Sequence, residues 1–204
     1  MTSEATGLTL RARDGATFLF DPGALCLELL VTGGPGELAV FETLHRPTDL
    51  ADWLGRSRLG LDPERVAVTP EQLHQARQLR DHLWELARSR VRGHTPPATP
   101  LRVLNEVAAQ PPLAPRLTPE GTRDWAHPLD GARALATVAR DAVTLFTGPY
   151  RHRIRQCGAE DCSLLFVDVS RPGRRRWCSM ERCGNRHKVR ALRARREREE
   201  GAGP

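Results

Sequence analysis

The sequence of 204 residues predicts an α+β fold, with a mainly helical N-terminal domain that carries short strands, followed by a small cysteine-rich module. Three observations predict it. Segments with helical apolar periodicity and recognisable caps fill most of residues 21–146. Four of the five cysteines lie between residues 157 and 183. Residues 151–200 hold 15 Lys/Arg against 7 Asp/Glu, so this end of the molecule is strongly cationic.

The first elements of the N-terminal domain are expected to be short. Residues 17–20 are predicted to form a strand. Asp21 followed by Pro22 is typical of a helix start, with the aspartate as N-cap and the proline in the first turn. Thr48 is expected to cap a second short helix in the same way.

The clearest helix is predicted over residues 69–91. Thr69 should cap it, Pro70 suits its first turn, and Gln72 completes a capping box. Apolar side chains then recur at helical spacing and predict one buried face. The members of this stripe are Leu73, Ala76, Leu79, Leu83, Leu86 and Val91.

Two further helices and a pair of strands complete the predicted domain. A helix is expected to begin at Thr99, and another to run from Leu129 to Phe146. Between them, extended pieces near Leu117 and Trp125 flank a Pro-Glu-Gly turn. We place the boundary near residues 148–150, which gives domains at 1–148 and 151–198.

Aromatic side chains of the N-terminal domain could line a binding site for an unknown small-molecule effector. Pockets between packed elements are where such ligands bind. Buried aromatic residues are, however, more often part of the core. The candidates are Trp53, Trp84, Arg123 and Trp125.

Cys157, Cys162, Cys178 and Cys183 follow the pattern C-x4-C-x15-C-x4-C. Two close pairs of thiolates suit the tetrahedral coordination of one structural Zn²⁺. A module of this size rarely folds without a bound metal or a disulfide to stabilise it. The alternatives are disulfides, with three possible pairings, or buried thiols without a ligand. Cys26 lies on an apolar helix face and is expected in the core.

The segments around the cysteines predict how the module folds. Residues 164–169 should form a strand, and residues 174–177 should return as its hairpin partner. The second cysteine pair then falls at the start of the last helix. A ligand loop, a hairpin and a ligand-bearing helix are typical of a treble-clef-like zinc finger. A closed site with four sulfur ligands has no open position for a substrate, so we do not expect an enzyme.

The basic residues around the module predict nucleic-acid binding, because Lys and Arg that neutralise phosphates release counterions from the duplex. Val189 and Leu192 are expected to pack back on the zinc core, which leaves the basic faces of the last helix exposed. Duplex DNA is the first candidate partner, and RNA or an acidic protein are the alternatives. The proposed contacts are Arg174, Arg175, Arg176, Asn185, Arg186, Lys188, Arg190 and Arg193.

The stretch "CGAEDCSLLFVDVSRPGRRRWCSMERCGNRHKVRALRAR" resembles the CGNR zinc finger, whose four-letter name corresponds here to residues 183–186. "FLFDPGALCLELLVT" and "HRPTDLADWL" resemble the ABATE region that precedes this finger, although "ELLVTGG" departs from its usual acidic-aromatic-Val-Asn-Thr string. The resemblance implies a stress-related transcription regulator with a DNA-binding finger and an N-terminal sensor. It supports the four cysteines as zinc ligands and matches Arg175, Arg176, Asn185 and Arg186 to the motif.

No segment approaches the roughly 18 apolar residues of a membrane helix, and the N-terminus lacks the pattern of a signal peptide. We therefore expect a cytoplasmic protein with no membrane partner. Many DNA-binding proteins dimerise on paired half-sites, so a homodimer is one of the states we consider.

Overall fold

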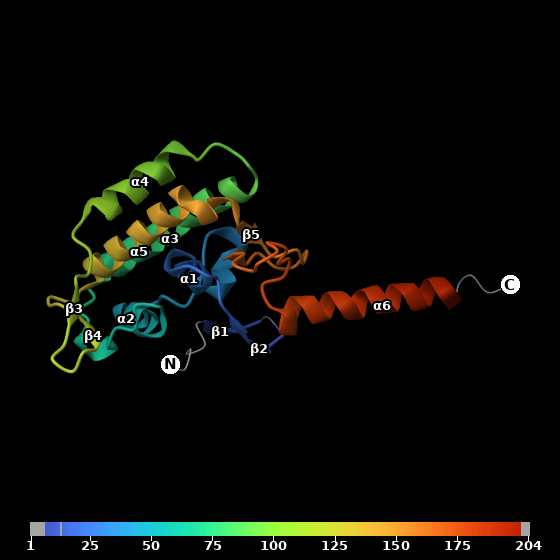
Figure 1. The fold of residues 1–204 in the computed structure, drawn as a ribbon, viewed down its shortest axis with the longest axis horizontal. Helices are drawn as coiled ribbons and strands as arrows, with labels where there is room; N and C mark the ends of the chain where they lie inside the picture. Colours follow the sequence, from blue (N-terminus) through green and yellow to red (C-terminus); the bar gives the residue numbers. More distant parts are fainter. Residues whose placement is uncertain (1–6, 13, 201–204) are drawn as a thin grey trace.

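The computed structural model describes residues 7–12 and 14–200, so residues 1–6 and residue 13 of the predicted first domain lie outside the described part. The predicted fold class is confirmed: the chain is mainly helical with three short hairpins (Figure 1). No helix within the described ranges combines the length and apolarity needed to cross a membrane. The helices are α1 (Leu25–Leu29), α2 (Pro47–Arg56), α3 (Pro70–Val91), α4 (Ala98–Ala109), α5 (Gly131–Thr147) and α6 (Asn185–Glu200).

Helix α3 is the centre of the N-terminal domain, and α4 and α5 pack along it (Figure 1). Its predicted capping box is confirmed: the Thr69 hydroxyl accepts the Gln72 N–H at 3.2 Å, and the Gln72 side chain accepts the Thr69 N–H at 3.0 Å. Most of the predicted stripe is buried, and Val91 at its end is half-buried. The capping box and the apolar periodicity therefore predicted this helix correctly.

The predicted starts of α1 and α2 were wrong. The Asp21 carboxylate accepts the N–H of Gly23 at 2.8 Å, and Gly23 adopts φ +83°, a left-handed conformation that turns the chain before α1. Helix α2 begins at Pro47, so Thr48 lies inside it. The Asp49 carboxylate accepts the backbone N–H groups of His45 and Arg46, the two residues that precede the helix.

The three hairpins are antiparallel and lie far apart in the sequence. The predicted strands near residues 17–20, 117 and 125 are confirmed. The hairpin partner predicted at residues 174–177 was wrong, because no strand forms there and β6 pairs with β5 instead. The strands are β1 (Leu8–Arg11), β2 (Thr17–Phe20), β3 (Pro115–Leu117), β4 (Arg123–Trp125), β5 (Ile154–Gln156) and β6 (Leu165–Val167).

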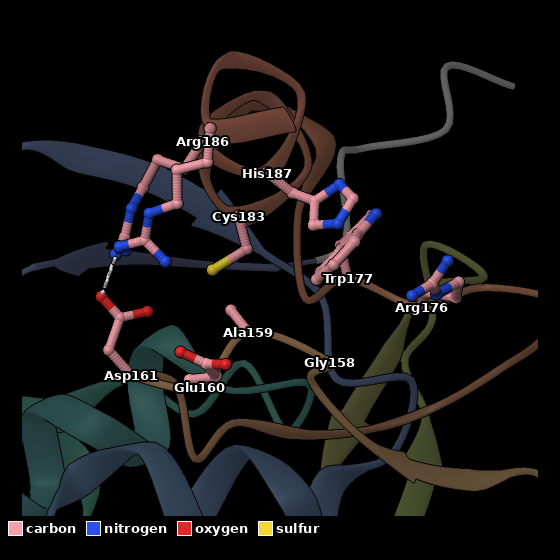
Figure 2. A pocket seen from close by; sticks show the side chains of 10 residues that line it. Gly158, Ala159, Glu160, Asp161, Arg176, Trp177, Cys183, Arg186 and His187 are labelled. Carbon is pink, nitrogen blue, oxygen red and sulfur yellow. Dashed lines mark hydrogen bonds and ion pairs between the residues drawn. The ribbon is translucent and has the colours of Figure 1, made fainter. Parts of the chain in front are cut away.

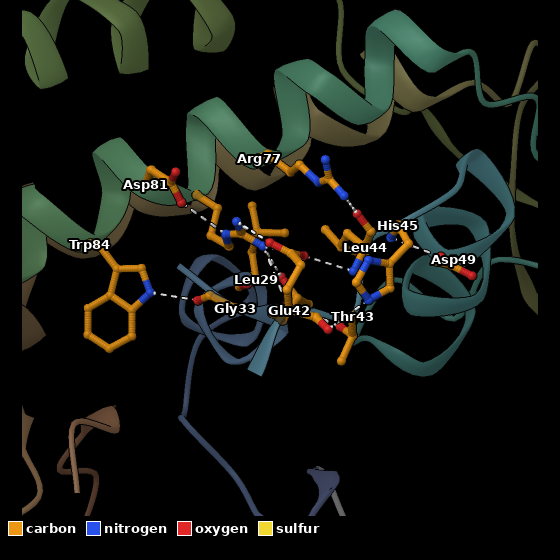
Figure 3. Close-up of polar contacts among 12 residues, drawn as sticks. Leu29, Gly33, Glu42, Thr43, Leu44, His45, Asp49, Arg77, Asp81 and Trp84 are labelled. Carbon is orange, nitrogen blue, oxygen red and sulfur yellow. Dashed lines mark hydrogen bonds and ion pairs between the residues drawn. The ribbon is translucent and has the colours of Figure 1, made fainter. Parts of the chain in front are cut away.

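A buried ion pair ties the loop after α1 to α3 (Figure 3). The guanidinium of Arg80 donates two hydrogen bonds to Glu42, at 2.9 and 2.8 Å, and the Arg80 side chain is almost fully buried. Trp84 donates from its indole N–H to the carbonyl oxygen of Gly33 at 3.1 Å. Bidentate pairing of this kind compensates the burial of a charge and fixes the loop geometry.

The tryptophans proposed for an effector pocket belong to the core instead. Trp53, Trp84 and Trp125 are all buried in the main apolar cluster. The Trp125 indole N–H donates to the carbonyl oxygen of Leu59 at 3.0 Å, and the exposed Arg123 lies over the Trp125 ring at 4.3 Å. The three indoles are therefore part of the packed interior of the N-terminal domain.

The apolar core crosses the predicted domain boundary. Ile154, Leu165 and Val167 of the β5–β6 hairpin pack into the main core of the N-terminal domain. The N–H of Val167 donates to the carbonyl oxygen of Pro22 at 2.8 Å. A second, smaller cluster of buried side chains lies in the finger, and Phe20 of β2 packs there against Cys157, Cys178 and Cys183. The finger and the N-terminal domain are therefore joined by a shared interior.

Candidate metal centre and basic surface

Four cysteine sulfurs converge where the β5–β6 hairpin meets the start of α6. Cys157 and Cys162 lie in the loop between β5 and β6, Cys178 follows the turn after β6, and Cys183 lies in the π-helical turn η5 (Met180–Gly184). All four sulfur atoms lie within 4.8 Å of one another. These residues are therefore able to bind one metal ion together.

The distances fit tetrahedral coordination by sulfur. Zn–S bonds of about 2.3 Å place the sulfurs of a tetrahedral site about 3.8 Å apart. The sulfurs of Cys162 and Cys178 are separated by 3.9 Å, which is close to this value and far too long for a disulfide. Three of the four cysteines are buried and Cys162 is partly exposed. Cys26 lies in the main core, as predicted.

The surroundings of the sulfurs favour a bound cation. Hydrogen bonds from Cys162 and Cys178 lower the pKa of Cys157, whereas contact with the Cys157 sulfur raises the pKa of Cys162 and of Cys178. Crowded sulfurs therefore cannot all ionise together without a positive charge among them. The Cys178 N–H also donates to the Cys157 sulfur at 3.4 Å, which orients this ligand.

Arg175 is partly buried between the finger and the N-terminal domain. Its guanidinium donates to the carbonyl oxygens of Cys178, of Trp177 at 3.1 Å and of Asp21 at 3.3 Å. It also lies over the Phe166 ring, 4.1 Å from the centroid. We therefore remove Arg175 from the proposed nucleic-acid contacts, because its donors are already used to join the finger to the N-terminal domain.

Asp168 fixes the turn that presents the basic residues. Its side chain is fully buried, and its carboxylate accepts the N–H of Ser170 at 3.0 Å and of Arg175 at 2.9 Å. The chain between them curls around this carboxylate, which explains why residues 174–177 form no strand. Arg174 and Arg176 point outward from the turn and are exposed.

A cavity of about 260 Å³ lies beside the cysteine cluster, between the first cysteine loop and α6 (Figure 2). The rings of Trp177 and His187 stack on one side with centroids 4.6 Å apart. On the other side, Asp161 forms an ion pair with Arg186 and lies 3.6 Å from Arg190. The sequence reasoning did not single out Asp161, although it is one of few acidic residues in this module.

The remaining proposed contacts lie along α6. Asn185, Lys188, Arg190 and Arg193 are exposed, and Arg186 is partly covered by its pairing with Asp161. The prediction for the apolar positions of the helix was wrong, because the side chains of Val189 and Leu192 are exposed. Aromatic side chains from β2 and β6 fill the finger's interior instead, namely Phe20 and Phe166.

Comparison with known protein families agrees with this architecture. Residues 23–149 match the ABATE family, described as "Putative stress-induced transcription regulator". Residues 153–196 match the CGNR zinc finger, and this range contains all four clustered cysteines. No curated protein sequence matches the chain. The ABATE match spans more than half of the sequence, so the chain belongs to the ABATE family and carries a CGNR zinc finger at its C-terminal end.

Proposed function

We propose that this protein is a non-enzymatic transcription regulator that binds duplex DNA through its zinc finger. The observation that carries the proposal is the placement of exposed arginines around a closed cluster of four cysteines. A metal centre would make the turn and the start of α6 rigid, so that these side chains are presented at fixed positions. The description of the ABATE family as a regulator supports the same function.

The metal we propose is one structural Zn²⁺. Thiolate ligands select soft or borderline-soft metals, and four sulfurs in tetrahedral arrangement are typical of structural zinc. Cys157, Cys162, Cys178 and Cys183 would provide all four ligands, which leaves no coordination position for water or substrate. Metal analysis of the purified protein should find one equivalent of zinc, and iron in its place would change the metal assignment.

Salt dependence of DNA binding tests the proposed function. Affinity for duplex DNA should fall steeply with salt, because each neutralised phosphate contributes about −0.9 to the logarithmic slope. Replacing the exposed Arg174, Arg176 and Arg193 by alanine should weaken binding and reduce the magnitude of this slope by about 3.

The matched control removes the same charge from the surface of the N-terminal domain. Arg88, Arg92 and Arg102 are exposed on or beside α3 and α4, and their replacement by alanine should leave the slope unchanged. No binding to duplex at low salt with zinc present would remove the proposal. Structured RNA that outcompetes duplex DNA would favour RNA instead, and weak competition by both would favour an acidic protein partner. We also predict a response to a small molecule or to stress, and we consider a homodimer.

A further inference from the structure

Helix α6 extends away from the rest of the molecule (Figure 1). Within the described part of the chain it packs mainly on η5, at its N-terminal end. Its 16 residues correspond to a length of about 24 Å. Most of the stability of a helix in a protein comes from packing against other elements, so a partner that contacts α6 along its length would stabilise it.

The two apolar side chains near the middle of α6 face solvent. Val189 and Leu192 are 48% and 43% exposed, and they lie three residues apart, on one face of the helix. With about 100° of rotation per residue, Asn185 and Arg196 fall on the same face, before and after them. Basic rows flank this face on both sides: Arg186, Arg190 and Arg193 on one, where Asp161 pairs with the first two, and Lys188 and Arg195 on the other.

The charge of the helix identifies its partner. Residues 186–196 contain six basic side chains and no acidic one, so an anionic surface is favoured on both flanks of the apolar face. A second copy of α6 would bring like charges together. Two apolar residues also fall short of the three or four heptads that a coiled coil requires. A duplex has the matching arrangement, with phosphates on both sides of a groove floor made of bases.

We propose that α6 lies in the major groove of duplex DNA, with Val189 and Leu192 facing the base edges and the flanking rows facing the phosphates. The proposal rests on the DNA-binding function proposed above. It identifies α6 as the element that contacts the bases and so recognises the DNA sequence. A helix with side chains is about 10–12 Å across and the major groove is about 12 Å wide. The 5-methyl group of thymine is the apolar feature of that groove, so Val189 and Leu192 would select thymines.

The test uses the full-length, zinc-loaded protein and a duplex selected from random DNA. The double variant V189A/L192A should bind this duplex about tenfold more weakly, because it removes apolar groups that bases would bury. Its binding to non-specific duplex and its salt slope should not change, since the basic rows remain. Replacing contacted thymines by uracil should weaken the wild type similarly and the variant little. The exposed pair Val40 and Leu117 provides the control variant V40A/L117A.

Chemical protection identifies the groove directly. Bound protein should protect guanine N7 in the major groove from methylation, while adenine N3 in the minor groove stays reactive. An unprotected guanine N7, or unchanged affinity of V189A/L192A for the selected duplex, would overturn the placement of α6 while salt-dependent binding by the wild type would still support the proposed function. If the wild type binds no duplex, the proposed function fails and the placement of α6 fails with it. Both substituted side chains are exposed, and alanine favours helix, so the variant should fold.

Discussion

Arg175 shows how a residue that fits a DNA-binding pattern can have an internal role. It lies between two other arginines, and all three match the basic signal equally well in the sequence. The structure separates them: Arg174 and Arg176 are exposed, whereas Arg175 donates to backbone carbonyls from both halves of the protein. The spatial neighbours of a side chain decide between these roles, and one of the neighbours of Arg175, Asp21, lies 154 positions away in the sequence.

The variant R175A should lower the free energy of unfolding by about 2–3 kcal/mol, because it leaves several part-buried carbonyl acceptors without their charged donor. Chemical denaturation of the zinc-loaded protein measures this change. The neighbouring R174A serves as the control and should change stability by less than about 0.5 kcal/mol. In DNA-binding titrations R174A should reduce the salt slope and R175A should not. A reduced slope with unchanged stability in R175A would identify it as a phosphate contact.

Glu28 is a buried carboxyl group that makes stability depend on pH. It accepts the N–H of Arg58 at 2.9 Å and pairs with the Arg58 guanidinium at 2.7 Å. Burial nevertheless raises its pKa to about 7, from an ordinary value of 4.5, because water is excluded from the charged form. The folded state therefore binds this proton more tightly than the unfolded state does between pH 4.5 and 7.

Tighter proton binding by the folded state means that the contribution of Glu28 to stability falls as pH rises from about 4.5 to 7. The stability advantage of the wild type over E28Q should decrease by up to about 3 kcal/mol across this range, as measured by denaturation at several pH values. The exposed Glu106, which pairs with Arg102 at the surface, gives the control variant E106Q. A constant difference between wild type and E28Q would show that Glu28 does not bind the proton.

At the scale of elements, the sequence predicted best what is determined locally. The Thr69–Gln72 capping box lies within four residues of sequence, and both of its hydrogen bonds form. The four cysteines were found because the spacing of metal ligands is itself a local pattern. The prediction of a helix start at Asp21 was wrong because an aspartate carboxylate can either cap a helix or close a turn. Here the left-handed conformation of Gly23 favours the turn.

Pairings between distant segments were beyond the sequence reasoning. Strand β6 was predicted, but it pairs with β5, which precedes it in the sequence, and not with residues 174–177. The segment after β6 forms a turn around the buried Asp168 carboxylate, which accepts the N–H of Arg175. Helical spacing likewise placed Val189 and Leu192 on one face, but the prediction that this face packs on the zinc core was wrong, because both side chains are exposed. Their exposure follows from the direction in which α6 leaves the finger, and that direction is set by η5, whose Cys183 is buried in the cluster with Cys157 and Cys178.

At the scale of the whole molecule, the finger is part of the structure of the N-terminal domain. Ile154, Leu165 and Val167 belong to the main core, and Phe20 of the N-terminal hairpin belongs to the cysteine cluster. Each apolar side chain of this size contributes about 1.5–3 kcal/mol when buried. A change that unfolds the finger therefore removes several kcal/mol of packing from the helical domain as well.

Removal of the metal should consequently destabilise the entire protein. A strong chelator should lower the melting temperature of the helices, measured by circular dichroism, and should speed hydrogen exchange in α3 and α5 as well as in the finger. The variant C178S, which removes one ligand, should have the same effect without a chelator. The chelator saturated with zinc is the control for nonspecific effects. If chelation makes the finger's cysteines reactive while the helices keep their melting temperature and protection, the two halves fold independently, and contacts such as that of Val167 with Pro22 contribute little to stability.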